Sequence, residues 1–231
     1  QVIPIVPTAI IFDVGRGGAT DWALPPWRAL GRAALEAAGE DFAIGTAGAG
    51  TGATTASLKG GLGSASQTLA NGTTVGALVA ANPIGHVTIG DGPHSWAAAV
   101  EQGDESGRLG PAMAPASLGP TKTEARSATV IGIVATDAPL TKTQAKRVAI
   151  MAHDGIARAV VPSHTPSDGD LIFAASTARR PEATSHVELI HIGHAAATCM
   201  ARAIARAIYA ATPSDGDPHP TWRERFGPAS G

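Results

Sequence analysis

The sequence changes character abruptly between residues 128 and 129. Residues 91–128 are rich in Gly, Pro and charged side chains and show no sustained periodicity, whereas the segment that follows, Thr129-Val-Ile-Gly-Ile-Val-Ala-Thr, is β-branched and apolar. Such a segment predicts a buried strand. An irregular stretch as long as 91–128 within a compact domain is usually functional or a linker. We therefore expect two parts, residues 1–128 and 129–231, the second of which opens on a strand.

Periodicity on both sides of this junction predicts alternating strands and helices. Thr141 and Gln144 form a capping-box pattern ahead of a helix that extends to about Val160. Further helices are expected at 26–38 and 194–211, strands at 9–14, 42–46, 73–81, 171–176 and 187–192, a partner for 73–81 at 85–90, and an irregular tail after Pro213. This alternation predicts an α/β layered sandwich.

Length and composition narrow the class of protein. A chain of 231 residues can bury one substantial core. Its net charge of −2 argues against nucleic acid and anionic membranes as partners, and no apolar run is long enough to span a bilayer. The single cysteine, Cys199, excludes an internal disulfide and fits a cytoplasmic setting. The start, Gln1-Val-Ile-Pro, lacks an initiator Met and a signal peptide, which suggests that it lies within a longer chain.

The spacing of the candidate motif residues does not match several common types of binding or catalytic site. The glycine-rich stretch that contains Gly48-Ala-Gly-Thr-Gly lacks the third glycine of a dinucleotide fingerprint, and no acidic residue lies about 20 positions further on. His186, His191 and His194 match no common zinc signature, and no nucleophile-elbow motif is present. We therefore expect neither a metal nor a cofactor.

Three charged residues remain as candidates for catalysis. Lys59 is the only Lys or Arg between residues 42 and 90, so it is either exposed and idle or buried and paired. If it is buried, it could lower the pKa of a nucleophile or shuttle its proton. Asp168 and Asp170 come just before a predicted strand, where they form either a turn or a pair that orients an amine or a base. Asp215-Gly-Asp217 has the same form, and we expect no role for it.

At Ser127-Ala-Thr-Val-Ile-Gly-Ile-Val-Ala-Thr-Asp-Ala the sequence resembles the junction of the DmpA-type aminopeptidases. This family of N-terminal nucleophile hydrolases includes D-aminopeptidase/esterases, β-peptidyl aminopeptidases and the nylon-oligomer hydrolase. The resemblance covers nearly the whole chain. It recurs at Ile5-Val-Pro-Thr-Ala-Ile-Ile-Phe-Asp, Ala47-Gly-Ala-Gly-Thr-Gly-Ala, Leu58-Lys-Gly-Gly-Leu-Gly, Thr74-Val-Gly-Ala-Leu-Val, Ala80-Ala-Asn-Pro-Ile-Gly, Ala152-His-Asp-Gly-Ile-Ala-Arg-Ala and His164-Thr-Pro-Ser-Asp-Gly-Asp-Leu-Ile-Phe-Ala.

The resemblance implies a four-layer αββα sandwich, a fold shared with ornithine acetyltransferases, and a precursor that cuts itself between Ala128 and Thr129. Thr129 would then be the nucleophile, with its own α-amino group, which titrates near pH 8, as the base. By position, the resemblance implies that Asn82 helps to hold the oxyanion and that Lys59 lies beside the nucleophile. It implies that Asp168 and Asp170 support the amine and self-cleavage. The residues that it places at the oxyanion or the pocket are Phe12, Gly48 and Gly50.

The sequence departs from the family pattern at three places. Ala128 stands where relatives often carry Asn or Gly, and Phe12 where several have a Tyr that donates to the oxyanion. The family also has a longer N-terminal portion that has no counterpart in this chain. We expect residues 1–128 to be the α-chain part and 129–231 the β-chain of such an enzyme.

Two other functions stay open on the sequence alone. An ornithine-acetyltransferase-like acyl transfer would suit the fold, but that junction usually reads Ala-Thr-Met-Leu, whereas Val130-Ile131 follow Thr129. An inactive, uncut binding or structural homologue would suit Ala128 and Phe12. For an active enzyme we expect a small peptide or amide substrate (a D-amino-acid amide, a β-peptide or a nylon-type oligomer) and a homo-oligomer of αβ units.

Overall fold

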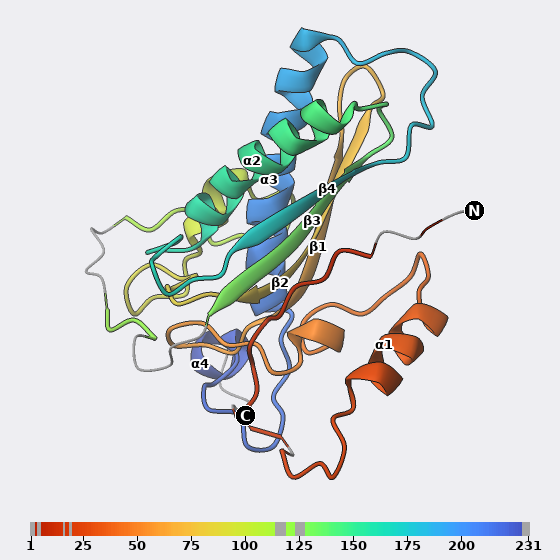
Figure 1. Cartoon of the computed structure of the whole chain (residues 1–231). Helices are drawn as coiled ribbons and strands as arrows, with labels where there is room; N and C mark the ends of the chain where they lie inside the picture. Colours follow the sequence, from red (N-terminus) through yellow and green to blue (C-terminus); the bar gives the residue numbers. More distant parts are fainter. Residues whose placement is uncertain are drawn as a thin grey trace.

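The computed structural model describes residues 3, 6–15, 17–18, 20–113, 119–122 and 128–227, which form a mixed α/β structure (Figure 1). A four-stranded sheet has the order β1-β2-β3-β4, in which β2 is antiparallel to both β1 and β3, and β4 runs parallel to β3. The strands are β1 (Gly61–Thr68), β2 (Thr74–Asn82), β3 (Thr129–Thr136) and β4 (Leu171–Ser176). The helices are α1 (Trp27–Glu36), α2 (Lys142–Ala159), α3 (His186–Tyr209) and α4 (Trp222–Phe226), with 3-10 turns η1 (Gly48–Gly50) and η2 (Trp96–Val100).

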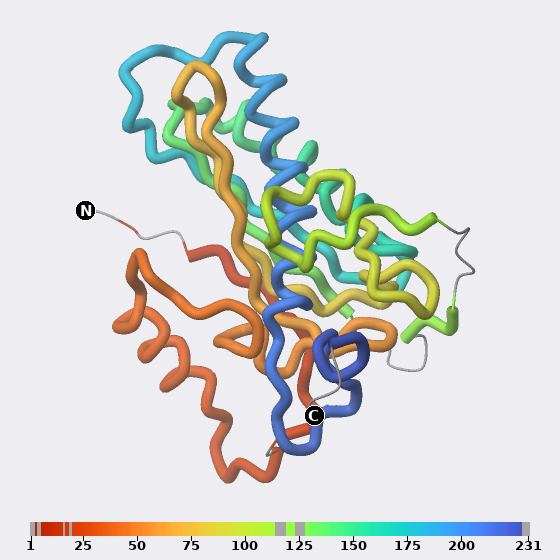
Figure 2. The backbone as a smooth tube through the Cα atoms, turned by 180° about the vertical axis from the view of Figure 1, so that it is seen from behind, coloured from red at the N-terminus to blue at the C-terminus, as the bar shows by residue number. Residues whose placement is uncertain are grey.

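Helices α2 and α3 pack side by side over one face of the sheet. Helix α3 contacts β1 and β2, and α2 contacts β4, as Figures 1 and 2 show from opposite sides. Because side chains alternate along a strand, every second residue of β2 and β3 points into this helical layer. Val75, Val79, Val130 and Val134 are buried there with Met200 and Ile204 of α3.

Glycines allow α3 to lie directly on β1. A Cβ atom at Gly63 would stand 1.9 Å from the carbonyl oxygen of Ala203, and one at Gly61 would stand 2.4 Å from that of Ala207. No side chain fits at either distance, so the backbone of the helix and that of the strand are in contact. This close approach requires glycine at both strand positions and alanine on the helix.

The opposite face of the sheet is apolar and is not covered by helices of the described residues. Ile133 is 38% exposed there, and Leu78, Ile131 and Phe173 are partly exposed. The sheet and its single helical layer are the two layers that the described residues contribute to an αββα sandwich. Helix α1 stands apart from the sheet and buries none of its residues (Figure 1).

An internal ion pair fastens the irregular stretch after η2 to the helical layer. Arg202 of α3 donates Nε to Glu105 Oε2 at 2.8 Å and Nη2 to Glu105 Oε1 at 2.5 Å, and its Nη1 donates to Ser66 O at 2.8 Å. Two parallel bonds of this kind give a guanidinium–carboxylate pair both strength and a fixed orientation.

The helices and strands with the strongest sequence patterns are present in the structure. Strands are confirmed at Thr74–Asn82, Thr129–Thr136 and Leu171–Ser176, and helix α1 is confirmed within 26–38. The capping box at the start of α2 is confirmed, since Thr141 accepts from the backbone of Gln144 and the Gln144 side chain accepts from that of Thr141.

Other sequence expectations are wrong. Residues 187–192 are not a strand but the first turns of α3, where the Ser185 side chain caps Glu188 N; a short apolar run between a cap and an Ala-rich segment does not discriminate between strand and helix. Residues 9–14 are irregular, and 42–46 contribute only a single bridge from Gly45 to Leu62.

Strand β1 was not expected, because its Gly, Ser and Ala residues have low strand propensity. It takes the place beside β2 that the sequence predicts for 85–90. The tail after Pro213 also holds a helix, α4, which begins with a capping box of Thr221 and Glu224. None of the helices in the described part of the chain is both long and apolar enough to cross a membrane.

We predict that Gly63→Ala lowers the free energy of unfolding by about 2–3 kcal/mol, because the added Cβ forces α3 away from β1. Gly76→Ala is the matched control: it lies on β2, and its nearest atom to an added Cβ is 3.8 Å away. Urea unfolding of both variants measures the difference. Equal stabilities for the two variants would contradict the close packing of α3 on β1.

Candidate active site

The ends of three strands bring the predicted site residues together. The register of β2 and β3 pairs Asn82, the last residue of β2, with Thr129, the first of β3. Both side chains are buried, with 0% and 6% of the residue exposed. Ala128 forms a parallel bridge with Asp168, just before β4. Residues from the two predicted parts of the chain therefore meet at one edge of the sheet.

The peptide bond between Ala128 and Thr129 is held in a defined environment. Thr129 Oγ1 donates a hydrogen bond to the carbonyl oxygen of Ala128 at 2.6 Å, and the backbone N–H of Gly169 donates to the same oxygen at 2.9 Å. Ala128 is 2% exposed. Two donors on one carbonyl oxygen polarise the bond and stabilise negative charge that develops on that oxygen.

Asp170 lies next to the nucleophile candidate. Its Oδ1 accepts from Val130 N at 2.8 Å, and its Oδ2 lies 2.8 Å from His164 Nδ1, an ion-pair contact without hydrogen-bond geometry. Its side chain is 4% exposed. Burial, together with the charge of Asp168, raises the pKa of Asp170 above its ordinary value, despite the opposing effects of Val130 N–H and His164.

Asp168 is engaged with its own loop. Its Oδ1 accepts from Ile84 N at 3.1 Å, and its Oδ2 accepts from Thr165 N at 3.0 Å and from Thr165 Oγ1 at 2.7 Å. These bonds hold the segment before β4 against the segment after β2. The structure thus brings both aspartates to the junction, and it gives Asp168 the bonding of a loop-forming residue.

The oxygen and the nitrogen of the Asn82 side-chain amide bond to different parts of the chain. Its Oδ1 accepts from Thr54 N at 3.1 Å and from Lys122 Nζ at 2.9 Å. Its Nδ2 donates to the carbonyl oxygen of Ile11 at 2.8 Å and, more weakly, to that of Phe12 at 3.5 Å. The amide can therefore act as a hydrogen-bond donor toward the N-terminal segment.

Phe12 lies beside this donor with its backbone in the left-handed region, at φ 57°. Its ring is exposed and lines a cavity of about 500 Å³ with neighbouring residues of 9–14 and Trp27. Gly50, in the turn η1, lies against β1, since an added Cβ would stand 2.1 Å from Leu62 N. Gly48 has φ 49° and no close neighbour. Phe12 thus lines the cavity, whereas Gly50 allows the turn η1 to pack against β1.

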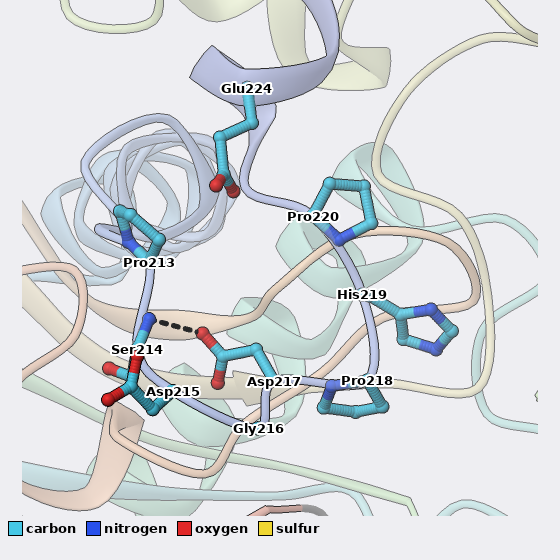
Figure 3. Close-up of a pocket in the computed structure, with 9 residues that line it drawn as sticks. All are labelled: Pro213, Ser214, Asp215, Gly216, Asp217, Pro218, His219, Pro220 and Glu224. Atoms are coloured by element: carbon cyan, nitrogen blue, oxygen red, sulfur yellow. Dashed lines mark hydrogen bonds between the residues drawn. The ribbon is translucent and has the colours of Figure 1, made fainter.

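Lys59 is buried, with 1% of its side chain exposed, and its ammonium forms an ion pair with Asp217. Asp217 lies on the loop after α3, where its Oδ2 accepts from Ser214 N at 2.6 Å (Figure 3). This loop surrounds a cavity of about 630 Å³. The expectation that the Asp215-Gly-Asp217 tripeptide has no role is wrong, because Asp217 is the partner of a buried cation.

The sequence alone does not indicate a role for Lys122. It lies in the irregular stretch before the junction, is 9% exposed, and its Nζ contacts Asn82 and Thr54. No periodicity or motif around Lys122 indicates this contact, which depends on how 119–122 folds back onto the end of β2. Among the described residues, no group of three His, Cys, Asp or Glu side chains could hold a metal ion.

The four-stranded sheet with a helical layer over one of its faces has the fold of the N-terminal nucleophile hydrolases. A solved structure of this fold, the L-aminopeptidase D-Ala-esterase/amidase from Ochrobactrum anthropi, is similar with a TM-score of 0.57 and 27% identity. The similarity covers 84% of this chain and 54% of that chain. That protein is a prototype for the serine aminopeptidases and has a variant of the Ntn hydrolase fold.

The chain belongs to peptidase family S58, whose family model matches residues 1–221. An uncharacterized aminopeptidase of Mycobacterium tuberculosis (strain ATCC 25618 / H37Rv) is 40% identical over 245 residues, which cover 100% of this chain and 70% of that protein. The 6-aminohexanoate-oligomer endohydrolase of Paenarthrobacter ureafaciens is 30% identical over 190 residues, which cover 76% of this chain and 50% of that enzyme. The resemblance to the DmpA-type aminopeptidases is thus confirmed, and the chain spans about half the length of the solved relative.

We predict an asymmetry between the two halves of the Lys59–Asp217 pair. Asp217→Asn leaves the buried ammonium of Lys59 without its counter-charge and lowers the free energy of unfolding by about 3 kcal/mol. Lys59→Met lowers it by less than half as much, because water can solvate the carboxylate of Asp217, which is 18% exposed. Chemical denaturation of both variants measures the costs. Asp217→Asn as stable as the unsubstituted chain would contradict the pairing.

Proposed function

We propose that this chain carries the catalytic residues of a hydrolase that cuts itself between Ala128 and Thr129 and then uses Thr129 to open amide bonds. The observation that supports this most directly is the junction itself: the Thr129 hydroxyl lies 2.6 Å from the Ala128 carbonyl oxygen, which also accepts the Gly169 N–H. A hydroxyl beside a polarised carbonyl is the arrangement that an intramolecular acyl shift requires.

Self-cleavage proceeds in two steps. The Thr129 Oγ attacks the carbonyl carbon of Ala128, the carbonyl oxygen takes up negative charge next to Gly169 N–H, and the C–N bond breaks as the Thr129 nitrogen receives the hydroxyl proton. This leaves an ester between Ala128 and the Thr129 oxygen. Water hydrolyses the ester, which yields a carboxylate on Ala128 and both a free amine and a free hydroxyl on Thr129.

The freed amine is the base for the second reaction. An α-amino group titrates near pH 8, so a useful fraction is neutral at physiological pH and can accept the proton of its own hydroxyl. The Thr129 oxygen attacks the substrate carbonyl, and the Asn82 Nδ2 donates to the resulting oxyanion in place of the Ile11 carbonyl oxygen. Asp170, bonded to the neighbouring Val130 N, lies where its carboxylate can hold the protonated amine.

The pocket beside Asn82 favours small substrates with an apolar part. The cavity of about 500 Å³ that residues 9–14 and Trp27 line is mostly apolar, and the backbone carbonyl that Asn82 contacts belongs to its wall. We propose an aminopeptidase or amidase reaction on short peptides, D-amino-acid amides, β-peptides or nylon-type oligomers. Acetyl transfer to ornithine remains the alternative, and no feature of the described residues favours it.

We further propose that the cut protein is a homo-oligomer of αβ units. The support is apolar surface: Ile10, Leu24, Leu30 and Leu35 of the N-terminal region are each more than half exposed, and such surface is usually covered by a partner. The only cysteine, Cys199, is a buried free thiol, which suits a reducing cytoplasm.

We predict that Thr129→Ala abolishes both cleavage and hydrolysis, because it removes the attacking oxygen, while Thr129→Ser retains both. Intact mass spectrometry with N-terminal sequencing of every species measures cleavage, and release of free amine from a peptide amide measures hydrolysis. An unsubstituted protein that yields a fragment beginning Thr129-Val-Ile-Gly supports the proposal. Cleavage of the Thr129→Ala variant at the same bond would refute it, and transfer of acetyl groups from acetyl-ornithine would favour the alternative.

We predict that Asp170→Asn slows self-cleavage at least about tenfold but raises thermal stability at pH 7. The folded chain holds the pKa of Asp170 above its unfolded value, so the ionised carboxylate costs stability above about pH 4 and this cost vanishes at lower pH. Asparagine removes the charge and keeps an oxygen for Val130 N–H.

Asp168→Asn is the matched control for that substitution. It loses at least one of three loop hydrogen bonds and lowers stability by about 1–2 kcal/mol. Thermal melts at pH 7 and pH 4 compare the two variants. An Asp170→Asn variant that is less stable at pH 7 and cuts at the normal rate would contradict the assigned role of Asp170.

A further inference from the structure

The ammonium of Lys122 makes four polar contacts with Asn82, the residue expected to bind the oxyanion, and with Thr54, which lies beside Asn82. Its Nζ lies 2.8 Å from Thr54 O, 3.0 Å from Thr54 Oγ1, 2.9 Å from Asn82 Oδ1 and 3.4 Å from Asn82 O. Its backbone N–H donates to Ile84 O at 3.2 Å. The lysine is 9% exposed, so these bonds form in a region from which water is largely excluded.

An ammonium on one end of an amide determines which way the amide points. The two ends of an asparagine side chain have nearly the same shape but opposite hydrogen-bonding capacity. Lys122 Nζ has donors only, so it bonds to the oxygen of Asn82 and disfavours the flipped amide, which would present its NH₂ to the cation. Thr54 N–H donates to the same oxygen and reinforces this orientation.

The orientation leaves the Nδ2 of Asn82 available for the reaction. It donates to the Ile11 carbonyl at 2.8 Å, on the wall of the apolar cavity, and Asn82 is the register partner of Thr129. A cation on the oxygen also polarises the amide and strengthens its N–H as a donor, more so where water is excluded. Lys59, the lysine that the sequence indicated, pairs with Asp217 instead.

We infer that Lys122 is a positioning residue of the proposed hydrolysis: its ammonium holds the Asn82 amide with Nδ2 toward the developing oxyanion. The inference rests on the proposed function, and it assigns to Lys122 a role that acts through Asn82. Because Lys122 precedes the cleaved bond and Asn82 ends β2, both residues stay in the same segment after the cut, so the contact can serve the mature enzyme.

The test compares Lys122→Met with Asn82→Ala and the double variant in the whole protein. Rates are divided by the concentration of cut protein, which intact mass spectrometry gives. We expect Lys122→Met to lower kcat by about 10- to 100-fold with KM changed less than about threefold, since the donor acts on the transition state. In the Asn82→Ala background the same substitution should have no further effect on kcat. Additive losses would overturn the inference.

Two further variants test whether a loss of kcat in Lys122→Met comes from misfolding. Lys122→Cys, treated with 2-bromoethylamine, regains an amine at nearly the original length and should recover much of the lost kcat; the only other cysteine, Cys199, is buried. Lys146→Met, the same exchange at an exposed position of α2, should keep the full rate. No recovery after aminoethylation of a folded protein would count against the inference.

A readout independent of activity separates this inference from the proposed function. The side-chain amide protons of Asn82, assigned in NMR spectra by their loss in Asn82→Ala, should shift in Lys122→Met and not in Lys146→Met. Unchanged Asn82 resonances would overturn the contact, even in an active enzyme. If they shift but the unsubstituted protein neither cuts itself nor hydrolyses amides, the contact is structural and both the proposed function and the role of Lys122 are wrong.

Discussion

The antiparallel pairing of β2 with β3 brings together the two residues at the centre of the candidate site. Its register places Asn82 opposite Thr129, and the parallel pairing of β3 with β4 brings Gly169 and Asp170 to the same edge. A slip of one residue would turn Thr129 toward the helical layer and away from Asn82, because side chains alternate between faces. The close contact of α3 with Gly61 and Gly63 of β1 holds the helical layer directly against the sheet.

The buried charges of the described residues fall into two kinds. Lys59 with Asp217 and Arg202 with Glu105 are ion pairs that fasten loops to the fold. Asp170, which also contacts His164, directs its charge at the backbone N–H of Val130, and Lys122 directs its charge at the Asn82 amide. Burial of a charge costs stability, and burial raises the pKa of Asp170. We interpret these two charges as retained for chemistry.

The sequence predicted what local pattern determines. The β-branched run of β3, which begins at Thr129, and the capping box of α2 both carry their signal within a few residues. What it missed depends on distant partners. Strand β1 exists because α3 packs on its glycines, the start of α3 is helical because an Ala-rich continuation follows it, and Lys122 matters only because 119–122 returns to the end of β2. Lys59 and Asp217 are 158 positions apart, so no local rule links them.

Covalent labelling of the cut protein tests the central claim, that Thr129 is the nucleophile, most directly. A β-lactone, a strained ester that acylates reactive hydroxyls, would be incubated with the protein, and the site of the adduct would be located by peptide mass spectrometry. The account predicts one acyl group per cut chain, on the oxygen of the peptide that begins at Thr129, and loss of amide hydrolysis in proportion to it. An adduct on another residue that accompanies the loss of activity, or an active protein that loses activity without an adduct on Thr129, would contradict the account.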